Sequence, residues 1–504
     1  MSKQIEPIVT NDDGDHQPPI QSVPKRPWKS YIWDTFDKSP EERKFLFKLD
    51  AGMLTFTCLG YFIRFLDQAN LNNAFVSGMK EDLNMLGNQY NYAQTLWTVG
   101  YIIGEIPSNL VLTKIRPSIW IPTLELIWSV LTICTCRVTS VNQLYALRFF
   151  IGLAEAGFFP GVMYMLGSWY GKNELGKRSV IFHVSGALAT MFSGYLMTAV
   201  IGLGGRLGHR GWQWLFIMDG VISLPVAVSS FFFLPDLPHN TRVFYLNKDD
   251  LALAEQRIKS FGRAKREGFS KEKLRKIFSR WHIWVFPLMA VFGGGASGVG
   301  QPFFAFYLKQ SKNPKYTLAQ INNYPTTQAA VMVVAELTYA WIADGPLNGK
   351  RWPVMLFAAT LSPVFWISLL VWNIPEWWRW FCYITLQQVI ALVPLNLIWA
   401  NEVCSDDNEE RALVVAVINT IQYAQSAWLQ LLIWKQTDSP RYKKGFPTAI
   451  AFSFVVIGII FLIRHLAKRE AEQKKSQRDQ IESDSGVVSS SNASEVAVEP
   501  GKSG

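Results

Sequence analysis

Long apolar segments recur along this chain, and they constrain its fold more than any other feature. A helix needs about 20 mostly apolar residues to cross a bilayer, and twelve windows meet or approach that length. In lipid, the backbone polar groups of such a segment must be satisfied within it, so these windows predict helices. The sequence therefore predicts an all-α integral membrane protein with 12 transmembrane helices. The windows lie near residues 47–69, 92–112, 119–136, 142–168, 179–201, 213–234, 281–308, 320–343, 353–372, 379–399, 411–434 and 446–466.

The windows fall into two groups of six, separated by a hydrophilic stretch. This spacing predicts an N-terminal six-helix bundle over 45–234 and a C-terminal six-helix bundle over 281–466. Residues 235–280 contain a basic amphipathic pattern and are expected to form a cytosolic linker along the membrane surface. The polar segments 1–44 and 467–504 are predicted to be disordered cytosolic tails.

Positive charge is distributed unevenly between the two sides of the predicted bundle. Most of the 49 Lys and Arg residues lie in the tails, the linker and the loops on their side. Because basic loops stay in the cytosol, both termini are expected there. The net charge of +10 reflects these surfaces. We expect no nucleic-acid partner, since the most basic segment is tethered between spans.

Composition and motifs indicate a membrane protein without catalytic chemistry. Only 17% of the residues are charged, whereas a soluble protein carries about 25%. The five cysteines have neither disulfide nor zinc spacing. The chain lacks a phosphate-binding P-loop and the HExxH, paired CxxC and GxSxG patterns. We therefore expect no enzyme activity, no cofactor and no metal, and any transport must draw on a gradient.

Two charged residues inside one apolar window are the most informative polar residues of the chain. Arg148 and Glu155 lie in the run RFFIGLAEAGFFPG at 148–161. A charge at the bilayer centre costs about 2.5–3.5 kcal/mol even on the mildest scale. The two positions are almost two helical turns apart, so both side chains share a face that looks into protein or water. They either serve a function or form a buried ion pair that joins two helices.

Two six-helix halves joined by a long cytosolic loop resemble the major facilitator superfamily. The loop ADGPLNGKRWP at 343–353 is similar to the Gly/Asp/Arg-rich loop motif of that superfamily. The resemblance implies a binding site at the midplane between the bundles and alternating access by rocking of the two halves. It also implies a gating role for Asp344, Lys350 and Arg351, which clamp helix ends in one conformation.

Longer stretches resemble the anion:cation symporter family, in its fungal allantoate and vitamin permease branch. Within that branch, GYIIGEIPSNLVLTKI and LDQANLNNA look most like the pantothenate permeases of yeasts. The other stretches that carry the resemblance are FLDQANLNNAFVSGMKEDL, RFFIGLAEAGFFPG, GWQWLFIMDG, ANEVCSDDNEERALVVAVINT and LLIWKQTDSPRYKKGF.

The resemblance implies that Asp67 and Glu155 carry protons. An acid in a poorly hydrated cavity can load and release a proton at neutral pH. The alternative for Asp67 is a hydrated acid at a helix end. Arg148 is expected to alternate between Glu155 and an anionic substrate, so that protonation of Glu155 frees it. His183 is either a proton shuttle or a packing histidine with a hydrogen bond.

Substrate contacts are expected from both halves. Gln68 stands where bacterial and animal members commonly have an arginine, and it could hydrogen-bond a hydroxyl or amide of the substrate. Arg64 lies one turn earlier and either supplies the missing charge or snorkels to an interface. Asn419 matches a polar position of the family's site, and Gln422 and Asn396 are further candidates. The alternative for these amides is interhelical hydrogen bonding.

The remaining intramembrane features are expected to serve gating or packing. The glycine-rich span VFGGGASGVGQPFF contains Gly294, Gly298 and Pro302, and it is expected to bend between states. Four other acids are expected to pair with neighbouring helices or to be structural, namely Glu105, Glu125, Asp219 and Glu336.

These features predict a monomeric proton symporter that imports a small organic monocarboxylate across the plasma membrane. The resemblance favours pantothenate, and biotin, nicotinate, allantoate and small peptides are the alternative substrates. The endoplasmic reticulum and the vacuole are alternative membranes. A nutrient sensor that does not transport is the alternative of another class. A drug exporter is disfavoured, because the span at 179–201 lacks the proline of the exporters' motif.

Overall fold

The structure is a computed structural model in which every regular element of the described residues is helical. It describes Thr35 and residues 38–112, 114–260, 270–298, 302–344, 346–347, 349–404 and 407–495. The N-terminal half contains α2 (Pro40–Leu49), α3 (Thr55–Ala74), α4 (Lys80–Asp82), α5 (Gln89–Leu112), α6 (Pro117–Cys134), α7 (Val141–Glu155), α8 (Phe158–Trp169), α9 (Lys172–Val200) and α10 (Gly211–Phe233). The linker contains α11 (Lys248–Ser260) and α12 (Lys271–Ser279). The C-terminal half contains α13 (His282–Ser297), α14 (Phe303–Gln310), α15 (Leu318–Asn323), α16 (Thr326–Asp344), α17 (Trp352–Val371), α18 (Glu376–Thr385), α19 (Leu392–Val403), α20 (Asn408–Leu432) and α21 (Gly445–Glu495).

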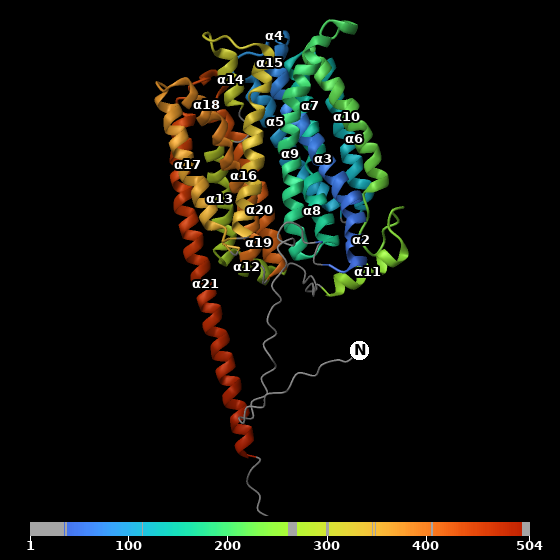
Figure 1. The fold of residues 1–504 in the computed structure, drawn as a ribbon, viewed down its shortest axis with the longest axis vertical. Coiled ribbons are helices and arrows are strands. Elements are labelled where there is room, and N and C mark those ends of the chain that lie inside the picture. Colours follow the sequence, from blue (N-terminus) through green and yellow to red (C-terminus); the bar gives the residue numbers. More distant parts are fainter. Residues whose placement is uncertain are drawn as a thin grey trace, which may run out of the picture.

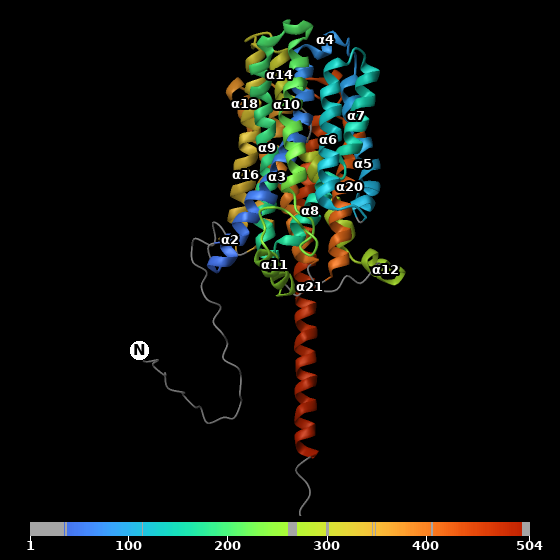
Figure 2. The ribbon, with the colours of Figure 1, turned by 90° about the vertical axis from the view of Figure 1, so that its right-hand side faces the viewer.

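The long helices run side by side along one axis, as Figures 1 and 2 show. Nine helical segments within the described ranges are long and apolar enough to cross a membrane. The windows predicted at 92–112, 281–308 and 320–343 are not among them. Two of these correspond to α5 and α16, which carry polar residues, and the third is divided between α13 and α14. The all-α membrane fold is confirmed, whereas the count of twelve spans and the cytosolic side of the termini stay predictions.

Several spans are interrupted where the sequence weakens the helix. The span predicted at 142–168 divides into α7 and α8, because Pro160 has no N–H to continue the helical ladder. The glycine-rich span breaks after Ser297, where Gly298 has a φ of 62°, and α14 begins after Pro302. A left-handed residue ends an α-helix, and glycine adopts it without strain. The break lies where we expect the hinge, and its movement stays a prediction.

The two halves share a hydrophobic core at one end of the molecule and have separate cores at the other. The shared core combines Phe75 and Tyr90 with Phe303 and Trp434. Of the two other clusters, one lies wholly in the C-terminal half, and the other draws only Tyr423 from it. Figure 1 shows α4, α14 and α15 at one end and the linker helices α11 and α12 at the other. The halves are therefore packed together at the end away from the linker.

Ion pairs fix the linker and the first helix against the N-terminal half. Glu174 accepts from Arg257 of α11 at 2.6 Å, and Arg178 donates to Asp50 at 2.7 and 2.8 Å. Burial alone would raise the pKa of Glu174, but Arg257, the Gly171 N–H and Lys38 outweigh it and lower that pKa. The carboxylate therefore stays ionised at neutral pH and holds α11 in place.

The boundary of each predicted tail with its neighbouring bundle falls inside a helix. Helix α2 starts at Pro40, ahead of the tail boundary expected at residue 44, because Ser39 caps it and Pro40 suits its first turn. Helix α21 continues through Glu495, although disorder is expected from residue 467. Ala, Lys, Glu and Gln, which favour helices, follow the apolar part of α21 directly and explain its extension as far as Glu482. The Ser-rich stretch beyond Glu482 has no such preference, and its helical conformation does not follow from composition. Most of the predicted N-terminal tail lies outside the described residues.

Helices α5 and α7 touch through glycines, which leads to a first prediction. A Cβ atom at Gly152 would lie 2.0 Å from the Trp97 carbonyl oxygen, and one at Gly100 would lie 2.1 Å from that of Phe149. Small residues allow membrane helices this close approach. We expect Gly152→Ala to lower the free energy of unfolding by about 1–3 kcal/mol, since the backbones must separate. The measurement is the thermal unfolding midpoint of the purified protein in detergent.

The matched control is Gly167→Ala on α8, where an added methyl group meets no atom within 4 Å. That variant should unfold at the wild-type temperature. Equal midpoints for the two alanine variants would refute the close packing of α5 on α7.

Candidate functional site

Arg64 lies at the centre of the site, at the junction of the two bundles. Its guanidinium is fully buried, and its Nε donates to Glu155 Oε2 at 3.0 Å. Its Nη2 donates to the Tyr423 hydroxyl of α20 at 3.3 Å. The guanidinium carbon also lies 4.9 Å from the centre of the Tyr101 ring. Of the two alternatives for Arg64, the structure favours an interior charge over snorkelling to an interface.

Glu155 is the last residue of α7, at the break before α8. The chain turns there at Ala156 and Gly157, and a Cβ at Gly157 would lie 1.7 Å from the Ser108 hydroxyl of α5. Glycine therefore allows the broken helix to approach α5. The Glu155 carboxylate is buried and also accepts from Gln68 Nε2 at 3.1 Å. Its Oε1 has no hydrogen-bond partner among the described residues.

Arg148 does not hydrogen-bond to Glu155, which corrects the expected pairing of these two residues. Its Nη2 instead donates to Gln94 Oε1 at 3.3 Å, and its guanidinium lies 5.8 Å from the Trp97 ring centre. The spacing along α7 places the two side chains on one face, but Arg64 of α3 comes closer to the acid. Arg148 is buried and still acts on Glu155 electrostatically.

Asp67 lies one turn beyond Arg64 on α3 but faces another set of groups. It is buried, and its Oδ2 accepts from the Thr132 hydroxyl of α6 at 3.0 Å. Asp219 of α10 lies beside it, since Asn70, one turn after Asp67 on α3, donates to Asp219 Oδ2 at 2.7 Å. The structure therefore rules out the alternative of a hydrated acid at a helix end.

Helices α5 and α20 join the two bundles through polar side chains. Asn419 Nδ2 donates to Glu105 Oε1 at 2.8 Å, and the Thr420 hydroxyl donates to Glu105 Oε2 at 3.3 Å. Glu105 thus pairs with a neighbouring helix, as expected, and it does so across the bundle interface. Asn419 lies one turn before Tyr423, so one face of α20 reaches both Glu105 and Arg64.

The other two predicted amides line a small pocket inside the C-terminal half. Asn396 and Gln422 lie there with Gly294, between α13, α19 and α20, around a cavity of about 10 Å³. The Asn396 side chain also donates to the Phe286 carbonyl at 3.1 Å. This bond agrees with the alternative of interhelical bonding for Asn396. These residues are separate from the hydrogen bonds around Arg64.

His183 of α9 packs against aromatic rings beside the site. Its ring centre lies 5.8 Å from that of Tyr61 and 6.1 Å from that of Phe159, both in edge-on contacts. Arg64 acts on it electrostatically. These contacts favour packing, and a role for His183 in moving protons stays a prediction.

The loop residues expected to clamp helix ends form such a clamp within the C-terminal half. Arg351 Nη2 contacts Asp344 at 2.6 Å and Glu402 at 2.7 Å, which links α16, α17 and α19. Glu402 is a partner that the sequence does not indicate. Lys350 is exposed beside the clamp.

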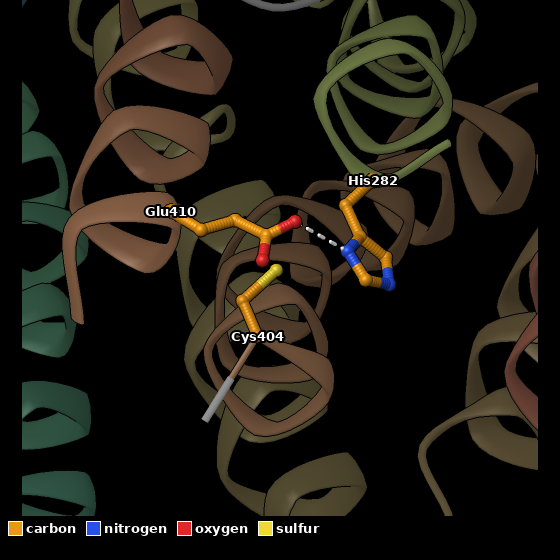
Figure 3. Close-up of side chains that lie close together, drawn as sticks. All are labelled: His282, Cys404 and Glu410. Carbon is orange, nitrogen blue, oxygen red and sulfur yellow. Dashed lines mark hydrogen bonds and ion pairs between the residues drawn. The ribbon is translucent and has the colours of Figure 1, made fainter. Parts of the chain in front are cut away.

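In the ranges that the structure describes, one group of side chains has the composition of a metal site. The ligand atoms of His282, Cys404 and Glu410 lie within 4.8 Å of one another. Figure 3 shows the Glu410 carboxylate pointing at the imidazole of His282, with Glu410 Oε1 2.7 Å from His282 Nδ1. Arg280 also binds Glu410, and the second ring nitrogen faces Glu470 at 2.9 Å. Arg280 thus neutralises Glu410, and Lys474 neutralises Glu470, so we interpret the group as an ion-pair cluster that joins α13, α20 and α21.

The partners that complete the site come from helices far apart in sequence. The sequence singles out neither Tyr101, Tyr423 nor Gln94, and it treats Asp219 as structural. One signal was available for Tyr423, which shares a helical face with Asn419. Tyr101 has no comparable signal, because aromatic residues are common throughout the spans.

Comparisons with known proteins agree with this fold. The family model described as the Major Facilitator Superfamily matches residues 57–428. The chain is 35% identical to the pantothenate transporter liz1 of Schizosaccharomyces pombe, over 87% of this chain and 85% of that protein. It is 34% identical to the pantothenate transporter FEN2 of Saccharomyces cerevisiae, over 86% of each. A structure of the proton:xylose symporter XylE is similar in fold, with a TM-score of 0.66 and 12% identity, over 84% of this chain and 96% of that one.

Proposed function

The chain belongs to the major facilitator superfamily, and we propose that it imports pantothenate together with protons across the plasma membrane. Its family makes it a multi-pass membrane transporter and not an enzyme. Two relatives that each share about a third of its residues over most of its length are named pantothenate transporters. Their names support this substrate for the chain.

The observation that carries the proposal is the position of Arg64. A buried guanidinium between the two bundles is a binding group for a carboxylate, which it can hold through two parallel hydrogen bonds. Its Nη1 has no hydrogen-bond partner in the described part of the chain, so one donor is available to a ligand. Pantothenate also carries an amide and two hydroxyl groups. Gln68 and Asn419 are the side chains we assign to them.

Competition for Arg64 couples the substrate to the proton in this proposal. Glu155 neutralises Arg64 while no substrate is bound. When Glu155 takes up a proton, its charge is lost, and Arg64 becomes free for the substrate carboxylate. When the substrate leaves, the ion pair re-forms and the proton departs. Arg64 thus replaces Arg148 as the residue that alternates, and Arg148 supports Glu155 from a distance.

The packing of the two halves supports alternating access. They share a core at the end away from the linker and have separate cores at the linker end. With the linker in the cytosol, this arrangement corresponds to a state that is closed toward the outside. Rocking of the two halves about the contacts of α5 with α20 and of α9 with α16 would open the site toward the outside.

Growth rescue tests the substrate. Yeast cells that lack their own permease would express the chain and grow on limiting pantothenate, biotin, nicotinate, allantoate or small peptides, each at several external pH values. We expect rescue by pantothenate, and stronger rescue in acid medium. Rescue by another compound alone would refute pantothenate as the substrate.

Uptake of labelled pantothenate separates a transporter from a sensor. We expect cells that express the chain to accumulate label, and a protonophore to abolish the accumulation. Accumulation that persists without a proton gradient would refute proton coupling. Growth signalling without any uptake would support a sensor instead.

A further inference from the structure

Two buried carboxyl groups meet inside the N-terminal bundle, apart from the pair of Arg64 and Glu155. Asp67 of α3 and Asp219 of α10 are 1% and 0% exposed, and they are neighbours, because α3 packs against α10 and Asn70, one turn after Asp67, holds Asp219. The two carboxyl groups interact with each other through their side chains. Each has one donor from elsewhere, since Thr132 donates to Asp67 Oδ2 at 3.0 Å and Asn70 donates to Asp219 Oδ2 at 2.7 Å. The Oδ1 atom of each acid has no other donor in the described ranges.

The orientation of the Asn70 side-chain amide is fixed by its neighbours. The Ser193 hydroxyl donates to Asn70 Oδ1 at 2.5 Å, and Asn73 Nδ2 donates to Ser193 Oγ at 2.6 Å. Because its oxygen is thus occupied as an acceptor, the Asn70 amide must present its N–H group to Asp219. This chain of bonds from α9 and α3 holds Asp219 in place and supplies no cation.

Chemistry then requires a proton between the two acids. Ionised carboxylates only accept hydrogen bonds, so two of them cannot bond to each other. Two like charges in contact away from water also repel strongly, and such pairs keep one proton. The charged groups that act on the pair are Glu155 and Arg148, both on α7. Arg64 already neutralises Glu155, so Arg148 is the cation left for the two acids, and one positive charge balances only one of the two carboxylates.

We propose that Asp67 and Asp219 bind one transported proton as a single unit. Uptake forms one O–H bond and changes the charge of the pair from −2 to −1. Release breaks that bond in the state of the transport cycle in which α3 and α10 separate the two carboxyl groups. Asp219 is therefore part of the proton site, although its position in sequence indicates only a structural role. This inference rests on the proposed proton symport and adds a residue to it.

The first test measures the proton directly. Infrared spectra of the purified protein at neutral pH would show the carbonyl stretch of protonated carboxyl groups. We expect Asp67→Asn and Asp219→Asn each to remove one and the same band, because the remaining acid ionises beside the new amide donor. The double variant should remove no more. Two different bands that disappear additively, or no loss in Asp219→Asn, would refute a shared proton.

The second test measures coupling in reconstituted vesicles. We expect Asp219→Asn, like Asp67→Asn, to lose accumulation driven by a proton gradient and to retain exchange of labelled for unlabelled pantothenate. Glu125→Gln is the control, since Glu125 is a fully buried acid of α6 outside this network. Wild-type accumulation in Asp219→Asn would overturn the proposal. If the wild-type protein itself shows no proton-driven accumulation, the proposed function fails, and the infrared test still decides whether the pair shares a proton.

Discussion

Replacing Arg64 with glutamine is expected to reduce pantothenate uptake about 10- to 100-fold. Hydrogen bonds to a charged group are worth about 1.5–3 kcal/mol, and 1.4 kcal/mol corresponds to a factor of ten. The variant also leaves Glu155 buried opposite a neutral side chain, because its ion-pair partner is lost. The measurement is the initial rate of labelled uptake, corrected for the amount of protein at the cell surface.

A double variant separates the two possible roles of Arg64. If Arg64 only neutralises Glu155, then Arg64→Gln combined with Glu155→Gln removes both charges and should restore exchange of labelled for unlabelled pantothenate, the activity that Glu155→Gln alone is expected to keep. If Arg64 binds the substrate, the double variant stays inactive, and we expect this result. Arg137→Gln is the matched control, because Arg137 is exposed at the end of the 3-10 turn that follows α6. Restored exchange in the double variant would contradict the proposed binding role.

Glu155→Gln is expected to abolish accumulation driven by a proton gradient while exchange of labelled substrate continues. A glutamine approximates the protonated acid in shape and charge, so Arg64 is always available to the substrate carboxylate. The protein then binds and releases substrate without carrying the proton of this site. The measurement compares gradient-driven uptake with exchange in the same vesicle preparation, across a range of external pH.

The control for this variant is again Glu125→Gln, which should keep both activities and their pH dependence. Glu155→Gln vesicles that accumulate substrate with the wild-type pH dependence would remove Glu155 from the coupling scheme. Loss of exchange together with accumulation would also count against the scheme, since it would mean that the carboxylate is needed for binding.

Much of the fold follows from the sequence, because every segment that crosses a bilayer must be long and apolar and must satisfy its own backbone hydrogen bonds. Windows such as 119–136 and 353–372 read as membrane helices by length and apolarity, and the structure has helices there as α6 and α17. Local chemistry also places the breaks, since Pro160 lacks a donor and Gly298 accepts a left-handed conformation. Residues 467–495 show the limit of this reasoning, because composition indicates a tail and the structure continues the helix.

The sequence by itself determined which residues are costly to bury, and the tertiary structure decided which of them meet. Arg64, Asp67, Arg148 and Glu155 each stand out as polar residues in apolar windows. Helical periodicity relates only residues of the same helix, so it placed Arg148 beside Glu155. The long side chain of Arg64 reaches from α3 to Glu155 at the end of α7, and packing of α3 against α10 brings Asp219 to Asp67. Contacts between helices depend on how the helices pack in three dimensions. The spacing of residues within one helix gives no information about which residues of other helices lie nearby.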